Sequence, residues 1–386
     1  MKEILSGNVA AAYGAKLAKP DVISAYPITP QTPVVEKLSE FISEGELDSR
    51  YLKVESEHSV MSTCIGASIG GARTFTATSS QGLALMQEML FWAANGRCPI
   101  VMANVNRGMA PPWSMWSDHT DFIAQSSTGW VQLFCHTNQE ILDTIIQAYR
   151  IAEDERVMLP VMVSYDAFDL SHMSEEVKIP EEEKVEDFLS SFDFSPIDLD
   201  EPKLLWGAAF PEDALGFRQD MVDSMNNVIG VIEEVRKEFQ TRFGRGTGLI
   251  ETYECESAET VLVTIGSLSG TARVAVDWLN DEEYSVGLAR IKSFNPFPVA
   301  ELREVLREKE LVLTFDRGLS FNRGAIYSGV RDLLYGVEEP PTVYGYYAGV
   351  AGTSVSREEF AESVKNSVED LRKGFKEGMR WIAGGD

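Results

Sequence analysis

Apolar and polar positions alternate in blocks along the first 170 residues. Short apolar runs typical of buried strands occupy residues 22–26, 51–54, 74–77, 100–105 and 161–165. Apolar residues at helical spacing lie between these runs, at residues 34–41, 83–93 and 141–152. Strands that alternate with helices at this spacing predict an α/β fold with a doubly wound parallel sheet covered by helices on both faces.

The pattern changes at Ser174. Residues 174–200 are acidic, interrupted by proline and weakly periodic, which predicts a surface linker. A long amphipathic helix is expected at about 217–243, as a brace across a domain junction. In contrast, residues 59–72 are rich in Gly, Ala, Ser and Cys, so we expect an interior helix that approaches its neighbours closely.

A second, smaller α/β domain is expected to begin near Ala258. Its expected strands are 261–265, 285–289, 311–315 and 342–347, and its expected helices are 271 onward, 299–308, 325–335 and 358–382. The glycine turn before the first of these helices lacks the Lys-Ser/Thr ending of a phosphate loop, so we expect no nucleotide site there. We therefore divide the chain into residues 1–245, with the linker and bracing helix at about 174–245, and residues 246–386.

Composition narrows the possible functions. The length of 386 residues suits two domains, and the net charge of −26 argues against nucleic acid as a partner. No apolar run is long enough for a membrane span, and the first twenty residues are typical of a first helix and not of a signal peptide. The four cysteines form no CxxC unit and the four histidines no HExxH, so we expect no metal site within this chain, and buried free thiols in a cytoplasmic protein.

The loop at residues 26–32, YPITPQT, follows an apolar run that predicts a strand. Two prolines bracket Ile28 and Thr29 and restrict the backbone around them. Ligands of open α/β sheets bind outside the carboxyl ends of strands, so this stiff loop could place the Thr29 hydroxyl in a binding site. A well-packed turn without a ligand explains the loop equally well.

Two further strand-to-helix junctions carry polar side chains. The segment VESEHS places Glu57 at the start of a helix, where an acidic first turn would be favoured by the helix dipole alone. The segment TATSSQG places Ser80 and Gln81 at another helix start, which suits an anion or a polar ligand, although simple capping explains it nearly as well.

Arg107 lies directly after the expected strand 100–105. An arginine at this position can bind a carboxylate through two parallel hydrogen bonds. The following Pro111, Pro112, Trp113 and Trp116 would stiffen and dry the loop, which favours a binding role over an ordinary surface ion pair.

Together these segments resemble the α subunit of the 2-oxoacid:ferredoxin oxidoreductases, especially the pyruvate type. The matching stretches are AYPITPQTPVVEKLSEF, VESEHSVMSTCIGASIGGARTFTATSSQGLALMQEMLFWAA, PIVMANVNRGMAPPWSMWSDHTD and, more weakly, FDRGLSFNRGAIYSG. The resemblance covers most of residues 1–172 and continues more loosely over 258–355. It implies a thiamine pyrophosphate (thiamine diphosphate)-binding domain of the pyrimidine type, followed by a domain like the transketolase C-terminal domain.

The resemblance also implies a role for each candidate residue. Glu57 would face N1′ of the aminopyrimidine ring, Thr29 would lie near substrate and cofactor, and Arg107 would hold the 2-oxoacid carboxylate. These three are the expected catalytic residues. The expected cofactor-binding residues are Glu57, Tyr26, Pro27, Ile28, Thr29, Ser80 and Gln81.

The family implies partners as well. A β subunit would hold the Mg2+-bound diphosphate and a [4Fe-4S] cluster, and we find no Gly-Asp-Gly motif with an Asn pair, nor a cysteine set for a cluster, in this chain. Further γ and ferredoxin-like δ subunits are expected, with CoA as co-substrate and ferredoxin as electron acceptor. Because the chain is acidic, we expect ferredoxin to dock on another subunit.

The chain departs from the family pattern in three places. QSSTGW at 125–130 replaces QRDTGW, Asn295 replaces an arginine before Pro-Phe-Pro, and the glycine-rich run near the end is AGVAG. We expect the first change to lie near the substrate, which leaves a branched-chain or other 2-oxoacid as an alternative to pyruvate. A non-catalytic assembly subunit and a stand-alone binding protein are alternatives of a different class.

Overall fold

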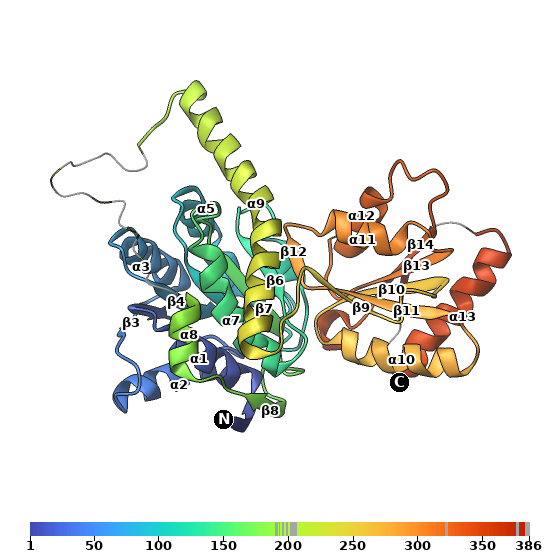
Figure 1. Cartoon of the computed structure of the whole chain (residues 1–386), viewed down its shortest axis with the longest axis horizontal. Helices are drawn as coiled ribbons and strands as arrows, with labels where there is room; N and C mark the ends of the chain where they lie inside the picture. The colour runs from blue at the N-terminus through green and yellow to red at the C-terminus, as the bar shows by residue number, and fades with distance from the viewer. Residues whose placement is uncertain are drawn as a thin grey trace.

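The computed structural model describes residues 1–189, 192, 194, 197, 200, 207–320, 323–375 and 378–382. These residues form two α/β units that lie side by side (Figure 1). The first sheet has the strand order β12-β6-β7-β5-β4-β2-β3, and all neighbours are parallel except β12. Its strands are β2 (Val22–Ala25), β3 (Arg50–Lys53), β4 (Thr74–Thr78), β5 (Val101–Asn106), β6 (Val131–Phe134), β7 (Val161–Asp166) and β12 (Ser293–Asn295).

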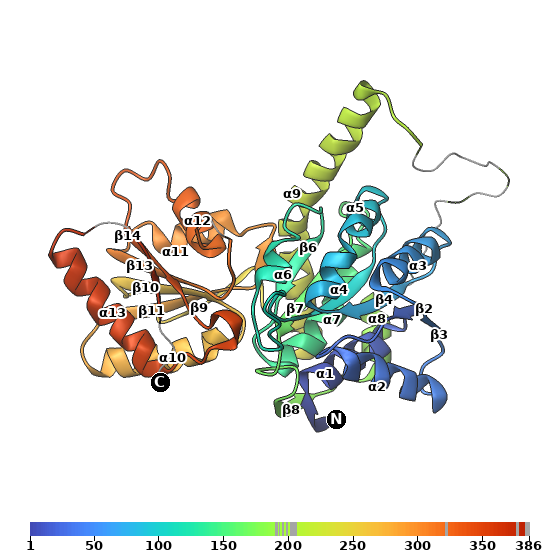
Figure 2. The ribbon, with the colours of Figure 1, turned by 180° about the vertical axis from the view of Figure 1, so that it is seen from behind.

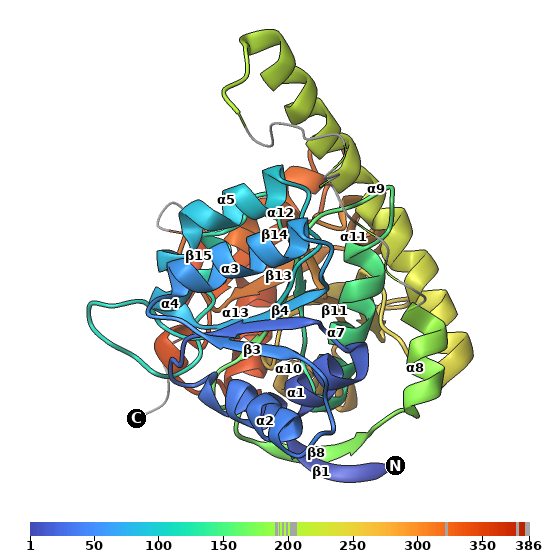
Figure 3. The ribbon, with the colours of Figure 1, turned by 90° about the vertical axis from the view of Figure 1, so that its left-hand side faces the viewer.

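Helices cover both faces of the first sheet. Figure 3 shows one group on each side, and the same two groups form separate apolar cores with the sheet. One face carries α1 (Gly7–Ala18), α2 (Thr32–Ser43) and α7 (Asn138–Ala152). The other carries α3 (Glu57–Ile69), α4 (Ser80–Leu85) and α5 (Gln87–Asn95). The predicted doubly wound sheet is therefore confirmed.

The second sheet has the order β15-β14-β13-β10-β11-β9, and only β9 is antiparallel to its neighbour. Its strands are β9 (Ile250–Tyr253), β10 (Thr260–Ile265), β11 (Val286–Ile291), β13 (Leu311–Asp316), β14 (Thr342–Tyr347) and β15 (Met379–Trp381). The helices around it are α10 (Leu268–Asp281), α11 (Val299–Leu306), α12 (Ala325–Leu333) and α13 (Arg357–Arg372), and Figure 2 shows α10 and α13 opposite α11 and α12. A short 3-10 helix, η1 (Val350–Gly352), follows β14.

The prediction of a surface linker after Ser174 is wrong for its first part, which forms regular secondary structure. β8 (Ser174–Lys178) pairs with the unexpected N-terminal strand β1 (Lys2–Ser6), and α8 (Glu182–Leu189) follows. α8 buries Val185, Phe188 and Leu189 against the core, because these three apolar residues share one helix face. Much of the remaining expected linker, at 190–206, lies outside the described residues.

Other boundaries also differ from the predictions. The expected helix over 358–382 ends at Arg372 as α13, and β15 follows it. The expected helix at 83–93 is divided at Met86 into α4 and α5, the helix expected from 271 begins at Leu268, and β6 was not predicted. β15 and β6 are only three and four residues long, which is too short for a clear apolar pattern in the sequence.

The expected long helix is α9 (Pro211–Phe243). Its C-terminal half buries Val228, Val231, Val235 and Phe239 next to α7, while its N-terminal half projects beyond the two units (Figures 1 and 2). After α9 the chain enters β9 of the second sheet, but β12 then returns to pair with β6 of the first. The two units are thus connected through the sheet as well as through the helix.

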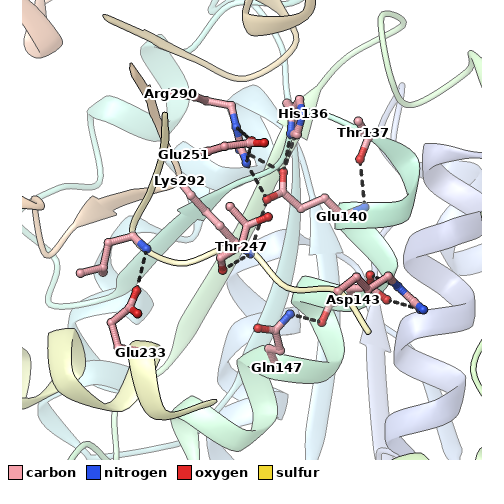
Figure 4. Close-up of polar contacts among 12 residues, drawn as sticks. His136, Thr137, Glu140, Asp143, Gln147, Glu233, Thr247, Glu251, Arg290 and Lys292 are labelled. Carbon is pink, nitrogen blue, oxygen red and sulfur yellow. Dashed lines mark hydrogen bonds and ion pairs between the residues drawn. The ribbon is translucent and has the colours of Figure 1, made fainter. Parts of the chain in front are cut away.

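A buried ionic cluster also joins the two units (Figure 4). Arg290 of β11 donates two hydrogen bonds of 3.0 Å to the carboxylate of Glu140 on α7. Lys292 lies 3.5 Å from the same carboxylate, and His136 contacts it at 2.8 Å. Burial opposes ionisation, but Arg290 and Lys292 outweigh it and hold the pKa of Glu140 well below its usual value.

Two further predictions, on the cysteines and on membrane-spanning helices, can be compared with the structure. All four cysteines are buried free thiols, as predicted, and burial raises the pKa of Cys64, Cys98 and Cys135 to about 12. Within the described ranges, no helix is both long and apolar enough to cross a membrane.

Candidate active site

The candidate residues come together at one edge of the first sheet. β2, β4 and β5 are parallel and adjacent, so their carboxyl ends lie at the same edge. The loop after β2 supplies Thr29, the turn after β4 supplies Ser80 and Gln81, and the first residue after β5 is Arg107. α3 begins with Glu57 after β3, beside β2.

Arg107 connects two of these loops. Its side chain is only 8% exposed, and its two terminal nitrogens donate to the backbone oxygen of Thr29 and, at 2.6 Å, to Oε1 of Gln81. Burial lowers the pKa of Arg107, although the Asp121 carboxylate opposes this change. The guanidinium forms no ion pair with a described side chain, and its Nε is buried without a partner among them. The alternative that Arg107 forms an ordinary surface ion pair is therefore wrong for the described chain.

Thr29 is held through its backbone and not through its hydroxyl. The Thr29 side chain is exposed, and no described residue hydrogen-bonds to its hydroxyl. The rest of the loop is fixed by Gln31, whose side-chain amide donates to the oxygen of Tyr26 at 2.9 Å and whose backbone N–H donates to Ile28. Tyr26 and Ile28 are half-buried, and Pro27 is exposed.

Ser80 and Gln81 form the turn under Arg107. Ser80 has a φ of +47°, a conformation that non-glycine residues rarely adopt, and its hydroxyl contacts Gly108 O at 2.8 Å and Gln81 Oε1 at 2.7 Å. The preceding Ser79 makes no side-chain capping bond, so capping does not account for this segment. Nε2 of Gln81 is buried without a partner among the described residues.

Glu57 lies beside this turn. It is 6% exposed, and its carboxylate forms no hydrogen bond or ion pair with any residue that the structure describes. The carboxylate is packed against α4, because a Cβ atom added to Gly82 would lie 2.7 Å from Glu57 Oε1. The helix dipole favours a negative charge at the start of α3, which is the alternative explanation given in the sequence analysis. The dipole alone does not explain why Glu57 is buried.

Asp121 is a buried residue of the site that the sequence did not single out. It lies in α6 (Thr120–Ile123), and its carboxylate accepts hydrogen bonds from the backbone N–H of Ser80 at 2.9 Å and from the Asn106 side chain at 2.8 Å. The only signal was its presence in the segment WSDHTD. A single acidic residue in a loop does not reveal which backbone groups it will meet.

The tryptophans after Arg107 do not dry the loop as expected, because they are exposed in this chain. Trp113 is 83% exposed and Trp116 about half exposed. Trp116 instead reaches the second unit, where it lies against Gly352, and it also contacts Phe168.

The sequence departure at Ser126 and Ser127 lies before β6. The oxygen of Ser126 accepts from Asn295 of β12, and Gly129 packs against Ala94 and Met221. This segment leads to the amino end of β6, the opposite edge of the sheet from Arg107. The expectation that this change lies near the substrate stays a prediction.

Two family models match the chain. One, described as pyruvate flavodoxin/ferredoxin oxidoreductase, thiamine diphosphate-binding, matches residues 13–237, and one described as pyruvate:ferredoxin oxidoreductase core domain II matches residues 258–360. The chain belongs to the pyruvate:ferredoxin oxidoreductase family. The resemblance found in the sequence motifs is thus confirmed, and in this family the first domain binds thiamine diphosphate.

Individual members of the family match over almost the whole chain. Pyruvate synthase subunit PorA of Pyrococcus furiosus is 42% identical over an alignment of 390 positions, which covers 99% of this chain and 98% of that protein. Ketoisovalerate oxidoreductase subunit VorA of Pyrococcus horikoshii is 44% identical over 382 residues, 98% of this chain and 95% of that protein.

Solved structures support the fold. A 2-oxoglutarate:ferredoxin oxidoreductase from Magnetococcus marinus, with 2-oxoglutarate, coenzyme A and succinyl-CoA bound, matches with a TM-score of 0.76 at 20% identity. The match covers 95% of this chain but only 65% of that longer chain. A split-gene transketolase in an inactive β4 tetramer matches with a TM-score of 0.56 at 14% identity, over 95% of this chain and 99% of the other. The predicted fold class is confirmed.

Proposed function

We propose that this chain is the α subunit of a 2-oxoacid:ferredoxin oxidoreductase that converts a 2-oxoacid, preferentially pyruvate, and CoA to acyl-CoA and CO2. The observation that carries the proposal is Glu57, a residue only 6% exposed whose carboxylate has no partner in the described chain and lies against the turn that holds Arg107. A carboxylate on a largely buried residue is unfavourable without a hydrogen-bond donor, which supports a ligand that supplies the missing donor.

The aminopyrimidine ring of thiamine diphosphate fits this requirement. Its N1′ atom can share a proton with Glu57, and the ring would lie beside Ser80 and Gln81 and the loop from Tyr26 to Thr29. Glu57 would hold the proton at N1′, which favours the imino tautomer of the ring, whose nitrogen can accept a proton. When bound, thiamine diphosphate supplies the electron sink that decarboxylation of a 2-oxoacid requires.

Arg107 would bind the carboxylate of the 2-oxoacid. It is buried, it is positively charged and it forms no ion pair within the described chain. Its contacts to Thr29 and Gln81 fix the guanidinium plane, so less freedom is lost when a carboxylate binds. The Gln81 amide nitrogen, which also has no described partner, would donate to the same ligand region.

The site is completed by other subunits in this proposal. A β subunit would hold the diphosphate, Mg2+ and a [4Fe-4S] cluster, and γ and ferredoxin-like δ subunits would carry electrons onward to ferredoxin. The relatives are named as subunits, which supports an assembly of several chains. Cytoplasmic location and the division at residue 245 stay predictions.

A branched-chain 2-oxoacid is the second candidate substrate. The observation in its favour is that the identity to a ketoisovalerate oxidoreductase subunit, 44%, matches the 42% identity to a pyruvate synthase subunit. One alternative of a different class, a non-catalytic assembly subunit of the same fold, would have no need for an unpaired carboxylate at Glu57.

The test is anaerobic, CoA-dependent reduction of a viologen dye by the purified complex. Pyruvate, 2-oxoisovalerate, 2-oxoglutarate and an aryl pyruvate would be compared by kcat/KM in the same preparation. We expect the highest value for pyruvate. A preference for 2-oxoisovalerate would overturn the substrate assignment, and no reduction with any substrate, in a complex shown to hold its cofactors, would overturn the function.

A further inference from the structure

The Asp121 carboxylate joins three separate parts of the candidate site. It accepts hydrogen bonds from Ser80 N at 2.9 Å, Asn106 Nδ2 at 2.8 Å, Phe122 N at 2.7 Å and, at a longer 3.4 Å, Arg107 N. Asp121 is only 1% exposed. A buried carboxylate with this set of donors fixes the backbone on both sides of it, because each of its two oxygens is used twice.

The contact with Ser80 has a specific consequence. Ser80 adopts the left-handed conformation, which is strained for a non-glycine residue. The Asp121 carboxylate stabilises this conformation by accepting the Ser80 N–H. In this conformation the Ser80 hydroxyl reaches Gln81 Oε1, the atom that also accepts from Arg107.

The same turn continues to the carboxylate of Glu57. Gly82 lies two residues after Ser80 and leaves no room for a side chain beside Glu57. Asp121 therefore supports the segment that contacts both Arg107 and Glu57, although Asp121 itself contacts neither of their charged ends. No side chain other than Asp121 accepts the Ser80 N–H in the described structure.

We propose that Asp121 is a positioning residue that keeps Arg107 and the turn at residues 79–82 in the geometry that binds the carboxylate of the 2-oxoacid. The proposal rests on the proposed function and adds to it a residue that does not touch the substrate. It explains why an acidic residue is buried directly behind the candidate carboxylate-binding site, where a negative charge would otherwise oppose substrate binding.

The proposal has a pH signature. Burial, which outweighs the hydrogen bonds, raises the pKa of Asp121 to about 6, and the charged groups that face it are Arg107 and Asp118. Below that pH Asp121 takes up a proton and loses acceptor capacity for the Ser80 and Arg107 N–H groups. The KM for the 2-oxoacid should therefore rise as the pH falls through about 6, while it stays constant above.

The test compares Asp121→Asn with the unchanged chain in the complete complex. We expect the KM for pyruvate at pH 7.5 to rise about 10- to 100-fold, as the loss of a charge-assisted hydrogen bond predicts, with kcat lowered less than fivefold. The Kd of oxamate, a non-reacting 2-oxoacid mimic, should rise by the same factor in calorimetry. The KM of Asp121→Asn should no longer change between pH 7.5 and 5.5.

Asp118→Asn is the matched control, since Asp118 is a buried carboxylate of the same loop that bonds to Ala351 N and Thr120 N instead. We expect its KM to stay within threefold and to keep its rise below pH 6. An unchanged KM and oxamate affinity in Asp121→Asn, in an active complex, would overturn the proposal. An equal loss in both variants would do the same, because it would indicate general loosening of the loop. If the complex that contains the unchanged chain is itself inactive, this result would count against the proposed function instead.

Discussion

Two charged side chains of the candidate site belong to buried residues and form no ion pair in the described chain. Glu57 has no described partner at all, and Arg107 is held only by neutral oxygens, a backbone carbonyl and an amide. The partial removal of a charge from water without an ion pair costs folding free energy. Such arrangements are typical of residues selected for a ligand and not for stability. Glu57 lacks a donor and Arg107 lacks an anion, which are complementary needs for a cofactor ring and an acid substrate.

Glu57→Gln tests the first of these needs. A glutamine is similar in shape but cannot hold a proton at N1′ of the cofactor, so we expect kcat to fall about 10²–10⁴-fold in the assembled complex. The fold should be retained, because the change removes no hydrogen bond or ion pair of the described chain. Glu55→Gln is the control, since Glu55 is exposed in the same segment and contacts only Ser59. Full activity of Glu57→Gln would contradict the assigned role.

Gly82→Ala tests the packing around Glu57. The added Cβ would lie 2.6 Å from Thr78 Oγ1 and 2.7 Å from Glu57 Oε1, so one of these groups must move. We expect the affinity for thiamine diphosphate, measured by titration of the activity of the complex freed of cofactor, to fall at least tenfold. Gly66→Ala in α3 is the control: its Cβ meets nothing within 4 Å, so it should leave affinity unchanged and stabilise the helix by about 0.5–1 kcal/mol. Equal affinities would show that Glu57 is not positioned by this contact.

At the scale of elements, the sequence predicts those parts whose apolar pattern is strong. The core strands β2, β4, β5 and β7 are apolar runs between polar turns, and all were predicted. α8 was missed because three apolar residues stand among acidic ones, so the segment appears charged although one face is buried. β15 was missed because its three residues gain their strand pairing from β14 and not from their own pattern.

The candidate site was predictable to a different extent. Thr29, Gln81 and Arg107 follow predicted strands, so their meeting at one sheet edge follows from parallel pairing. The particular contacts among these residues do not follow from parallel pairing. That Arg107 binds the backbone of Thr29, and that Asp121 lies behind it, depends on how a long loop folds over the sheet, which no local pattern specifies.

Phe188→Ala tests whether α8 is part of the core of the first unit. Phe188 is 1% exposed and packs edge-to-face against Phe239 of α9, at 5.3 Å between ring centroids. We expect a loss of about 3–5 kcal/mol of stability, seen as a lower urea midpoint of the first unfolding transition. Asp187→Ala, on the exposed side of the same helix, should change the midpoint little. If α8 were only a linker, the two variants would behave alike.

At the scale of the whole molecule, two buried ionic clusters hold the units together. Glu140 of the first unit meets Arg290 and Lys292 of the second, and Asp166 at the end of β7 meets Arg317, at 3.3 Å, after β13. Burial opposes the ionisation of Asp166, but Arg317 and His119 outweigh it and lower its pKa. Asp166 also accepts from Ser117 at 2.6 Å and His119 at 2.7 Å, on the loop that begins with Arg107. The second unit thus contacts the loop that carries the candidate substrate arginine.

Glu140→Gln tests the first cluster and gives a pH dependence of known sign. The substitution leaves Arg290 and Lys292 buried without a full counter-charge, which we expect to cost about 3–5 kcal/mol at pH 7.5. Because the pKa of Glu140 is lowered in the folded chain, its stabilisation is present above its unfolded pKa, about 4.3, and is lost as the pH falls below it. The difference in melting temperature between Glu140→Gln and the unchanged chain should therefore be constant from pH 7.5 to 5.5 and shrink at pH 4. Glu251→Gln removes a half-exposed partner of the same arginine, 2.8 Å away, and should cost about 1 kcal/mol or less. A constant difference down to pH 4, or equal costs for the two variants, would show that the buried charge of Glu140 does not join the two units.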